Sequence, residues 1–385
     1  MFSHKNSLRH LLLPAHYCDE AHFHREIEQL FLPGWHFAAA VSELPRDGDF
    51  LTLELFGQPL LIRNSGGRLL AFENICCHRH CLLTDAAFGN QPKLKCRYHG
   101  WEYDDDGATA RIPEARCFRP WDRENSRLNR FRLETCGDLI FVSFSADAVP
   151  LREWLSPFYE ETERAFRRPA WLMRRVWEYD CPCNWKVPAE NTLESYHVTA
   201  LHPSFFGPNL PPEQNAEHLL DHRYTALTFT ANSRMEQWQA QLSRWLGTEP
   251  TLEYRHRHIH PNTILVSTDT INYALMYQPL TATTVRVRVR LFALRGTRRG
   301  LGARLASECA WRIGWKNTRQ VHNEDISIYP AQQRGLERSR HPGVLGTREE
   351  RIFAFQQYIL SSLGIPMPPS VEPVLCTPDE STDSS

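Results

Sequence analysis

The sequence lacks the features that would place the protein in a membrane or on a polyanion. No apolar run approaches the roughly 18 residues that a membrane-spanning helix needs. Lysine and arginine total 44, while aspartate and glutamate total 45, so no excess of charge favours nucleic acid or an anionic membrane as a partner. The leucine triplet near the start is too short for the core of a signal peptide. We therefore predict a cytoplasmic protein.

Two further absences concern cofactors and disulfides. No G-x-G-x-x-G fingerprint occurs, so a flavin or nicotinamide in the reaction would have to be bound by another polypeptide. The cysteine count of 11 is odd, and in a reducing cytoplasm cysteines serve as thiols or metal ligands rather than as a disulfide framework. With 385 residues, 42% of them hydrophobic, the chain is long enough for two domains or one large one.

Hydrophobic periodicity divides the chain into an N-terminal helical segment, a small all-β domain, a larger α+β domain and a polar tail. The expected bounds are 1–34, 35–145, 146–365 and 366–385. In the first part, residues 19–31 have one apolar helical face, and Asp19 is placed to cap the helix. The tail is rich in proline, serine and aspartate, a composition that favours disorder.

The larger domain begins and ends with helical periodicity. Residues 150–166 and about 301–363 have this pattern, whereas stretches between them, such as 283–292, alternate as strands do. This order predicts an α+β fold built on one antiparallel sheet. Residues 207–222 are polar and proline-rich, and we expect them to form a loop or lid.

Cysteine and histidine concentrate in the small domain, in "NICCHRHC" (74–81) and "CRYHGW" (96–101). Each segment supplies one thiolate and one imidazole. Two such loops suit a Rieske [2Fe–2S] cluster, in which two cysteines bind one iron and two histidines bind the other. A zinc site is the alternative, although a zinc finger usually carries its second histidine on a helix, three to five residues after the first.

The segment "NICCHRHC…CRYHGWEYDDDG" resembles the Rieske motif of the Rieske non-haem iron oxygenases, in particular their terminal oxygenase (alpha) subunits of the aromatic-ring-hydroxylating and quaternary-amine monooxygenase type. The resemblance runs from about residue 13 to 365. It implies that Cys76, His78, Cys96 and His99 bind the cluster. It also implies that the α+β domain is a helix-grip (START-like) catalytic domain.

Several positions near these ligands depart from related motifs. Cys81 has the spacing of a cysteine that forms a disulfide around the cluster in high-potential respiratory Rieske proteins, but its partner position is Tyr98. Trp101 replaces the serine that donates to the cluster there. Fewer hydrogen bonds to sulfur imply a reduction potential at the low end of the Rieske range, about −150 mV. His80 and Arg97 stand where the family usually has glycine and proline, which points to an altered docking surface for the electron donor.

A second pair of histidines lies in "NWKVPAENTLESYHVTALHP" (184–203). His197 and His202 are five residues apart, about 140° around an ideal helix, so both face one metal only if the helix ends or bends between them. Pro203 favours such an ending. In isolation, the pair would be two unrelated histidines near a helix end. The resemblance implies instead that both bind a mononuclear Fe(II).

A facial triad needs a carboxylate as third ligand. The segment "VHNEDISIYPAQQRGL" (321–336) resembles the family segment that carries it, and Asp325 matches the ligand position. The adjacent Glu324 is the rival ligand. One residue along a helix turns its side chain about 100° away from that of Asp325, so the two cannot serve equally, and we favour Asp325.

Two residues before the histidines complete the predicted site. Glu194 precedes His197 by three residues, on the same helix face, and could be simply a solvated or N-capping acid. In the family, the equivalent carboxylate bridges the first iron-binding histidine to a cluster histidine of the neighbouring subunit. This implies a link from His197 to His99 across a homotrimer. Asn191 either helps to organise the site or is an ordinary helix-terminal asparagine.

The resemblance implies a terminal oxygenase. Such a protein uses O2 and electrons from NAD(P)H, delivered by a separate reductase of flavin or ferredoxin type, to hydroxylate, demethylate or dihydroxylate a small organic substrate. The alternative is a Rieske electron-transfer or ligand-sensing protein without oxygenase activity, although a pure relay needs no second iron. "ENTLESYH" resembles the branch acting on quaternary amines. The nearby aromatic residues suit either a ring or a cation; they are Trp177, Trp185, Tyr196, Phe205 and Phe206.

Overall fold

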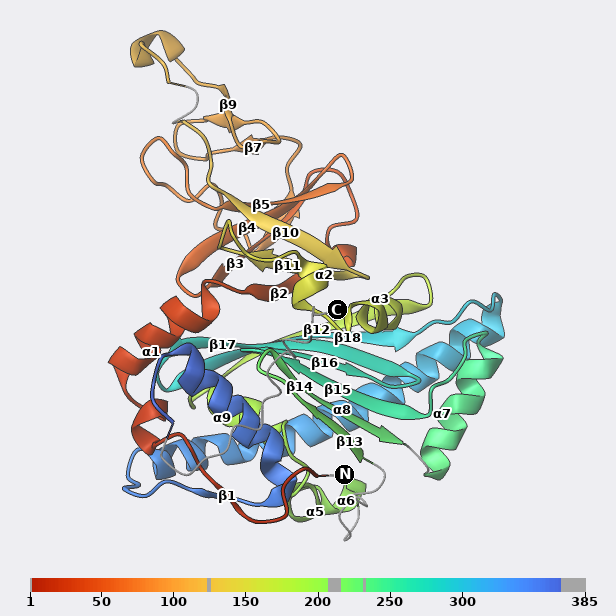
Figure 1. The fold of residues 1–385 in the computed structure, drawn as a ribbon. Coiled ribbons are helices and arrows are strands. Elements are labelled where there is room, and N and C mark those ends of the chain that lie inside the picture. The colour runs from red at the N-terminus through yellow and green to blue at the C-terminus, as the bar shows by residue number, and fades with distance from the viewer. Residues whose placement is uncertain (1, 123–125, 207–215, 231–232, 368–385) are drawn as a thin grey trace, which may run out of the picture. The chain divides into compact units, whose positions relative to one another are not determined.

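A computed structural model describes residues 2–122, 126–206, 216–230 and 233–367. The chain divides into two compact units. The β unit comprises Leu32–Ser156, and the α+β unit comprises Met1–Phe31 with Pro157–Ser385. Both units are built on antiparallel sheets, which confirms the predicted α+β class (Figure 1). In the described parts of the chain, no helix is both long and apolar enough to cross a membrane.

The β unit contains a seven-stranded sheet with the strand order β2-β11-β10-β5-β4-β3-β6. Its strands are β2 (Trp35–Ala40), β3 (Asp49–Leu55), β4 (Gln58–Ser65), β5 (Arg68–Glu73), β6 (Phe88–Asn90), β10 (Arg130–Cys136) and β11 (Leu139–Ser143). A small sheet holds β7 (Leu94–Lys95), β8 (Glu102–Tyr103) and β9 (Thr109–Arg111). Short helical turns are η3 (Val41–Glu43), η4 (Ala115–Phe118) and α2 (Leu151–Trp154). Cys76 and Cys96 pack in one apolar cluster with Leu61 and Phe72, so the sheet core anchors both cysteine-bearing loops.

The α+β unit contains a second seven-stranded antiparallel sheet, with the order β12-β18-β17-β16-β15-β14-β13. Its strands are β12 (Trp171–Cys181), β13 (Ala216–Leu220), β14 (Tyr224–Thr230), β15 (Glu253–Ile259), β16 (Thr263–Ser267), β17 (Ile271–Thr281) and β18 (Thr284–Leu294). Its longer helices are α3 (Tyr159–Ala165), α7 (Arg234–Trp245), α8 (Leu301–Leu336) and α9 (Glu350–Ser362).

The two faces of this sheet differ because strand residues alternate in direction. Tyr273 of β17 lies opposite Leu291 of β18, on the face that α8 and α9 cover (Figure 1). On the other face, the Asn272 side chain donates to the Ala165 carbonyl at the end of α3 (2.6 Å). One long helix packed on an antiparallel sheet is the predicted helix-grip arrangement. The covered face is the one that carries the candidate iron site.

The N-terminal segment forms β1 (Leu8–Arg9), η1 (Pro14–Tyr17), α1 (Glu20–Glu26) and a π-helical turn η2 (Ile27–Phe31). Asp19 caps α1 by accepting from the His22 amide (2.7 Å), as predicted. At its other end, the fully buried Glu26 accepts from Lys186 Nζ and Trp185 Nε1, each at 2.7 Å. Removing one partner of such a buried pair usually costs about 3–5 kcal/mol. The segment is therefore fastened to α4 (Lys186–Asn191), which leads into the iron site.

The helical and loop predictions need three corrections. Residues 150–166 form two helices, α2 and α3, because Pro157 disfavours helical backbone in the residue before it. The stretch 301–363 also divides, into α8 and α9, with β19 (Val344–Leu345) and η6 (Thr347–Glu349) between them. The predicted loop 207–222 is wrong at Ala216–Leu220, which pairs with β14 as an edge strand. Residues 207–215 and the predicted disordered tail from 368 onward lie outside the described residues.

Candidate cluster and iron sites

The two cysteine-bearing loops of the β unit close in the same way. The Cys76 amide donates to the carbonyl five residues later (2.9 Å), and its carbonyl accepts from the amide four residues later (3.0 Å). Cys96 makes the same two bonds, at 2.8 and 3.0 Å. The fourth residue after each cysteine is left-handed: His80 has φ 58° and Gly100 has φ 73°. This backbone disfavours side chains by about 1 kcal/mol, a strain that Gly100 avoids and His80 does not.

The four predicted cluster residues pair by type. The Cys76 and Cys96 thiols contact each other and are 2% and 1% exposed. The half-buried His78 and His99 rings lie with their centroids 4.6 Å apart. His78 Nδ1 is buried and has no hydrogen-bond partner among the described residues, so a donor atom is left for a metal. Two thiols and two imidazoles in separate pairs fit the two irons of a Rieske cluster.

The same residues do not form a single-ion site. In the described ranges, the potential metal-binding groups of three or more histidine, cysteine or acidic residues comprise only His197, His202 and Asp325. A structural zinc ion would need its four donors around one point. The geometry at the loops therefore disfavours the zinc alternative.

Tyr103 provides a hydrogen bond that the sequence analysis missed. Its hydroxyl donates to Cys76 Sγ (3.0 Å) and accepts from the Cys77 amide (3.3 Å). Burial raises the pKa of Tyr103 far above its ordinary value, so the hydroxyl keeps its proton. Hydrogen bonds to a cluster sulfur raise its reduction potential. This bond therefore opposes part of the low potential expected from Trp101, whose ring instead stacks on His78 at 4.6 Å.

The departures around the loops have local partners. Cys77 and Cys81 are free thiols, and the Cys81 thiol contacts the Leu82 carbonyl (3.3 Å). Arg97 forms an exposed ion pair with Asp85 (2.5 Å). None of these contacts displaces a predicted ligand.

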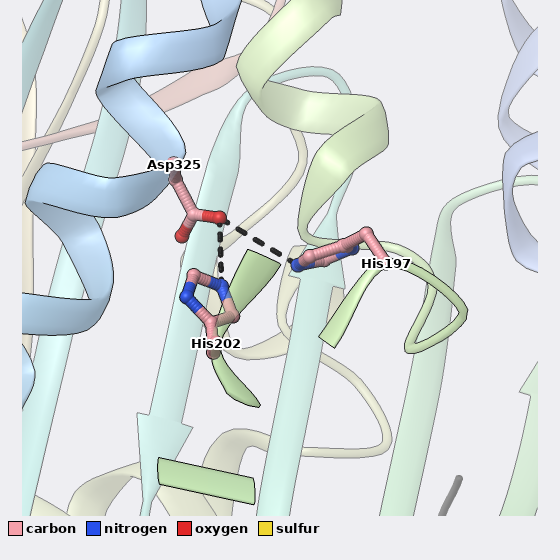
Figure 2. Close-up of side chains that lie close together, drawn as sticks. All are labelled: His197, His202 and Asp325. Carbon is pink, nitrogen blue, oxygen red and sulfur yellow. Dashed lines mark hydrogen bonds and ion pairs between the residues drawn. The ribbon is translucent and has the colours of Figure 1, made fainter. Parts of the chain in front are cut away.

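His197 and His202 converge because the helix between them is only one turn long. Helix α5 (Val198–Leu201) has His197 at its N-cap and His202 at its C-cap, and α6 (Pro203–Phe206) follows in a new direction. His202 Nε2 lies 3.0 Å from Asp325 Oδ1, and His197 Nε2 lies 3.6 Å from the same oxygen (Figure 2). The helix thus ends between the histidines, which is the condition that their spacing required.

The donor set fits a mononuclear iron. Ligand atoms of His197, His202 and Asp325 all lie within 4.8 Å of one another. His202 is 1% exposed and Asp325 is 8% exposed, so two of the three donors are shielded from water. Two imidazoles and one carboxylate on one side of a metal leave further positions open, as in the facial triad of non-haem Fe(II) proteins.

A glutamate contacts the outer ring nitrogen of each histidine. Glu194 Oε1 makes a short contact with His197 Nδ1, and its Oε2 accepts from the His197 amide (3.1 Å). Glu324 Oε2 lies 2.6 Å from His202 Nδ1. Carboxylates in this position fix the tautomer that leaves Nε2 free for a metal. Glu324, considered in the sequence only as a rival ligand, therefore contacts a ligand histidine on the side away from Asp325.

The protonation behaviour of this group follows from the same contacts. Burial opposes the charge on His197, but the hydrogen bond and the negative charge of Glu194 outweigh burial and raise its pKa. Hydrogen bonds from Gln320 and His202 lower the pKa of Glu324. The placement of Glu194 needs a correction. Helix α4 ends at Asn191 and α5 has its N-cap at His197, so Glu194 lies in the segment between the two helices rather than sharing a helix face with His197.

The other predicted residues are placed as follows. Asn191 is half-buried, and no hydrogen bond joins it to the iron-site residues that the structure describes. Trp185 is fully buried and belongs to the core, whereas Tyr196 is 62% exposed. Trp177 lies 5.5 Å from His322, which the sequence analysis missed although it precedes Asp325 by three residues on α8. The side chains of Phe205 and Phe206 lie outside the description.

Comparison with known proteins identifies a family for each of the two domains. Residues 169–364 match the family described as "Ring hydroxylating alpha subunit (catalytic domain)", and residues 34–131 match the "Rieske [2Fe-2S] domain". The chain therefore belongs to the ring-hydroxylating alpha subunits, and its cofactors are a Rieske [2Fe–2S] cluster and a mononuclear iron. The confirmed Rieske domain excludes the zinc-module reading.

The relatives have diverse names. The chain is 32% identical over 209 residues to biphenyl 2,3-dioxygenase subunit alpha of Rhodococcus jostii, covering 51% of this chain and 45% of the relative. It is 30% identical over 188 residues to the glycine betaine monooxygenase oxygenase subunit of Pseudomonas aeruginosa, covering 49% and 43%. The matched part thus spans about half the length of these curated relatives.

Solved structures share the whole fold. The structure of the quaternary ammonium Rieske monooxygenase CntA in complex with L-carnitine has a TM-score of 0.75 and 21% identity, covering 91% of this chain and 95% of that one. A naphthalene 1,2-dioxygenase mutant bound to phenanthrene has a TM-score of 0.73 and 20% identity, with 93% of each chain covered.

Proposed function

We propose that the protein is the terminal oxygenase component of a Rieske oxygenase system. It would use O2 and electrons from NAD(P)H, delivered by a separate reductase, to hydroxylate, demethylate or dihydroxylate a small organic substrate. The observation that carries this proposal is the convergence of His197, His202 and Asp325 in a chain that also has a Rieske domain. When bound, the cluster carries single electrons and the iron activates O2.

Each residue has a definite part in this proposal. Cys76, Cys96, His78 and His99 hold the cluster, with the sulfur side buried and the imidazole side nearer the surface. His197, His202 and Asp325 hold the iron. Glu194 keeps His197 in the tautomer that presents Nε2 to the metal, and its second oxygen accepts from the His197 amide.

The alternative is an electron relay or ligand sensor without oxygenase activity. A relay needs one redox centre, yet this chain maintains a second donor set from segments 123 residues apart. It also places a glutamate on the outer nitrogen of each of its histidines. These arrangements favour a working second metal site over a passive pocket.

Reconstitution tests the oxygenase proposal. The iron-loaded protein, mixed with a surrogate reductase and NADH, is screened against aromatic and quaternary-amine compounds while O2 uptake and product mass are recorded. We expect at least one compound to gain oxygen or lose a methyl group, and the His197→Ala variant to give no product. A protein that passes electrons to acceptors but forms no product with any compound would favour the relay.

The predicted homotrimer and its route across subunits are part of the same proposal. Co-expression of His99→Ala, which lacks a working cluster, with His197→Ala, which lacks a working iron, tests this route. In randomly mixed cyclic trimers, about one interface in four pairs an intact cluster with an intact iron. We expect activity to recover to about a quarter of the wild-type value. Purified mixed trimers without activity would contradict transfer between subunits. The cytoplasmic location remains a prediction.

A further inference from the structure

Arg351 stands apart from the other buried arginines of the α+β unit. Arg257, Arg288 and Arg290 are between 4% and 6% exposed. Each donates to a carboxylate: Arg257 to both oxygens of Glu161 (2.9 and 3.1 Å), and the other two to Glu178 (2.6 and 2.8 Å). Arg351 is the most buried of the four, at 1% exposure. Among the described residues, no carboxylate oxygen forms an ion pair with its guanidinium.

The hydrogen bonds of Arg351 join its guanidinium to no carboxylate among the described residues. One terminal nitrogen donates to His256 Nδ1 (2.6 Å), and Nε is buried without a partner among the residues described. Burial lowers the pKa of His256 well below its ordinary value, so this partner is neutral. Burial also lowers the pKa of Arg351, to about 9, which leaves the guanidinium charged at neutral pH. A buried charge without a hydrogen-bonded counter-ion destabilises a fold, so Arg351 lowers the stability of the protein unless a partner binds it.

The negative charge of the adjacent Glu350 favours the charged form of Arg351, but the Glu350 oxygens make their contacts with other groups. One accepts from the Ser3 amide (2.7 Å) and the other lies 3.1 Å from His218 Nδ1. At the start of α9, Glu350 therefore points toward the N-terminal segment, whereas Arg351 points toward the sheet.

Arg351 faces the same interior as the iron site. The strand register places His256, Val266 and Tyr273 side by side in one row across β15, β16 and β17. Adjacent strands are about 4.8 Å apart, so His256 and Tyr273 are separated by roughly 10 Å. The Tyr273 ring lies 5.8 Å from that of His322, one turn before Asp325 on α8. A continuous wall therefore leads from the arginine to the iron ligands.

Two tyrosines of this wall are not completely covered by protein. Tyr254 and Tyr273 share a hydrogen bond, and both retain solvent-accessible surface. Yet burial raises the pKa of both hydroxyls, most strongly for Tyr273. The wall therefore offers partly accessible aromatic surface, with protonated hydroxyls, on the side of the sheet that carries the iron site.

We propose that the Arg351 guanidinium binds a carboxylate of the substrate, and that the protein acts on organic acids whose other end reaches the iron site. This inference rests on the proposed oxygenase function and names its substrate class. A guanidinium forms paired, charge-assisted hydrogen bonds with a carboxylate. A substrate carboxylate would therefore be the hydrogen-bonded counter-ion that Arg351 does not have among the described residues. The aromatic wall would bind the rest of the molecule, whether a ring or an alkylammonium group.

Calorimetric binding to the holoprotein tests the inference without turnover. The probes are matched pairs of acid and amide: benzoate and benzamide, phenylacetate and phenylacetamide, hexanoate and hexanamide, and 4-(trimethylammonio)butyrate and its amide. We expect at least one acid to bind 10-fold or more tightly than its amide. In Arg351→Met that acid should lose about 10–100-fold in affinity, whereas its amide should change by less than about 3-fold. Arg351→Lys should retain part of the preference, because lysine keeps the charge but not the planar fork.

A matched control separates recognition from folding. Arg257→Met also removes a buried arginine, but it takes away an ion-pair partner of Glu161. We therefore expect a lower melting temperature, with the ratio of acid affinity to amide affinity unchanged. If Arg351 were only structural, Arg351→Met would lower the melting temperature and weaken acid and amide binding equally. That result, or amides that bind as well as acids in the wild type, or no binding by any acid, would overturn the inference.

The same experiment distinguishes this inference from the proposed function. If acids bind through Arg351 but give no product with reductase and O2, the oxygenase proposal is contradicted and the carboxylate inference stands. If a neutral compound is oxygenated and this activity persists in Arg351→Met, the carboxylate inference is contradicted and the oxygenase proposal stands.

Discussion

The cluster loops and the iron site assemble their ligands in opposite ways. All four proposed cluster ligands fall within residues 76–99, and two loops with the same backbone hydrogen bonds present them. The proposed iron ligands come from the two ends of a one-turn helix and from a helix 123 residues further along the chain. The loops are thus specified locally, whereas the triad depends on the packing of α8 beneath the sheet. Substitutions at one site should therefore leave the other intact, and substitutions outside the ligands should have graded effects.

The largest expected effect separates the two sites outright. His197→Ala should abolish product formation, because a triad missing one imidazole cannot hold iron in the required geometry. Iron should fall from about three to about two atoms per chain, while the visible absorption and the reduced EPR signal of the cluster persist. Metal analysis, EPR and product assays provide the readouts. In the converse variant, His78→Ala, the cluster signal should be lost. A colourless His197→Ala protein would show that the sites are not independent.

A smaller effect is expected where the triad depends on a residue that is not a ligand. Glu324→Gln should weaken iron binding by about 10–100-fold, because the amide no longer fixes the protonated Nδ1 of His202 as a carboxylate does. Competition with a chelator measures the affinity, and the cluster spectrum serves as the internal reference. Gln320→Ala, which removes hydrogen bonds to Glu324 and to Ser204 but leaves the Glu324 carboxylate in place, should have a weaker effect. Equal affinity in Glu324→Gln and the wild type would limit Glu324 to a surface role.

The corresponding change at the cluster acts on potential rather than on binding. Tyr103→Phe removes the hydrogen bond to Cys76 Sγ. A neutral hydrogen bond contributes about 1 kcal/mol, so the reduction potential should fall by roughly 40 mV for this one-electron couple. A redox titration followed by EPR gives the value, and iron content at the triad should not change. A potential that stays the same or rises would mean that the hydroxyl does not donate to the cluster sulfur.

The smallest expected effect compares the two loops with each other. His80 and Gly100 occupy equivalent left-handed positions, so His80→Gly should stabilise the loop slightly or leave it unchanged. Gly100→Ala should cost about 1 kcal/mol for the same backbone reason. Loss of cluster absorbance on titration with urea reports both changes. Stabilisation by Gly100→Ala would show that the loops are not equivalent.

The sequence was most informative where the chemistry is local. The Rieske pattern followed from the spacing of Cys76, His78, Cys96 and His99, since ligands in short loops must be neighbours in the chain. The alternation of β-branched and arginine residues in β18 likewise predicted a strand directly. Errors arose where pairing partners are distant: Ala216–Leu220 reads as loop by composition, yet it becomes a strand because β14 supplies its hydrogen bonds. The argument for Glu194 assumed a helix that in fact ends at Asn191.

By itself, the sequence determined the two kinds of metal-ligand residues and the α+β class, because ligand spacing and hydrophobic periodicity are local properties. Only the tertiary structure decided what surrounds those ligands. Tyr103 meets Cys76 from 27 residues away, Glu324 meets His202 across 122, and Arg351 meets His256 across 95. No local sequence pattern predicts such contacts, because they depend on the register of the strands and on the face with which each helix packs.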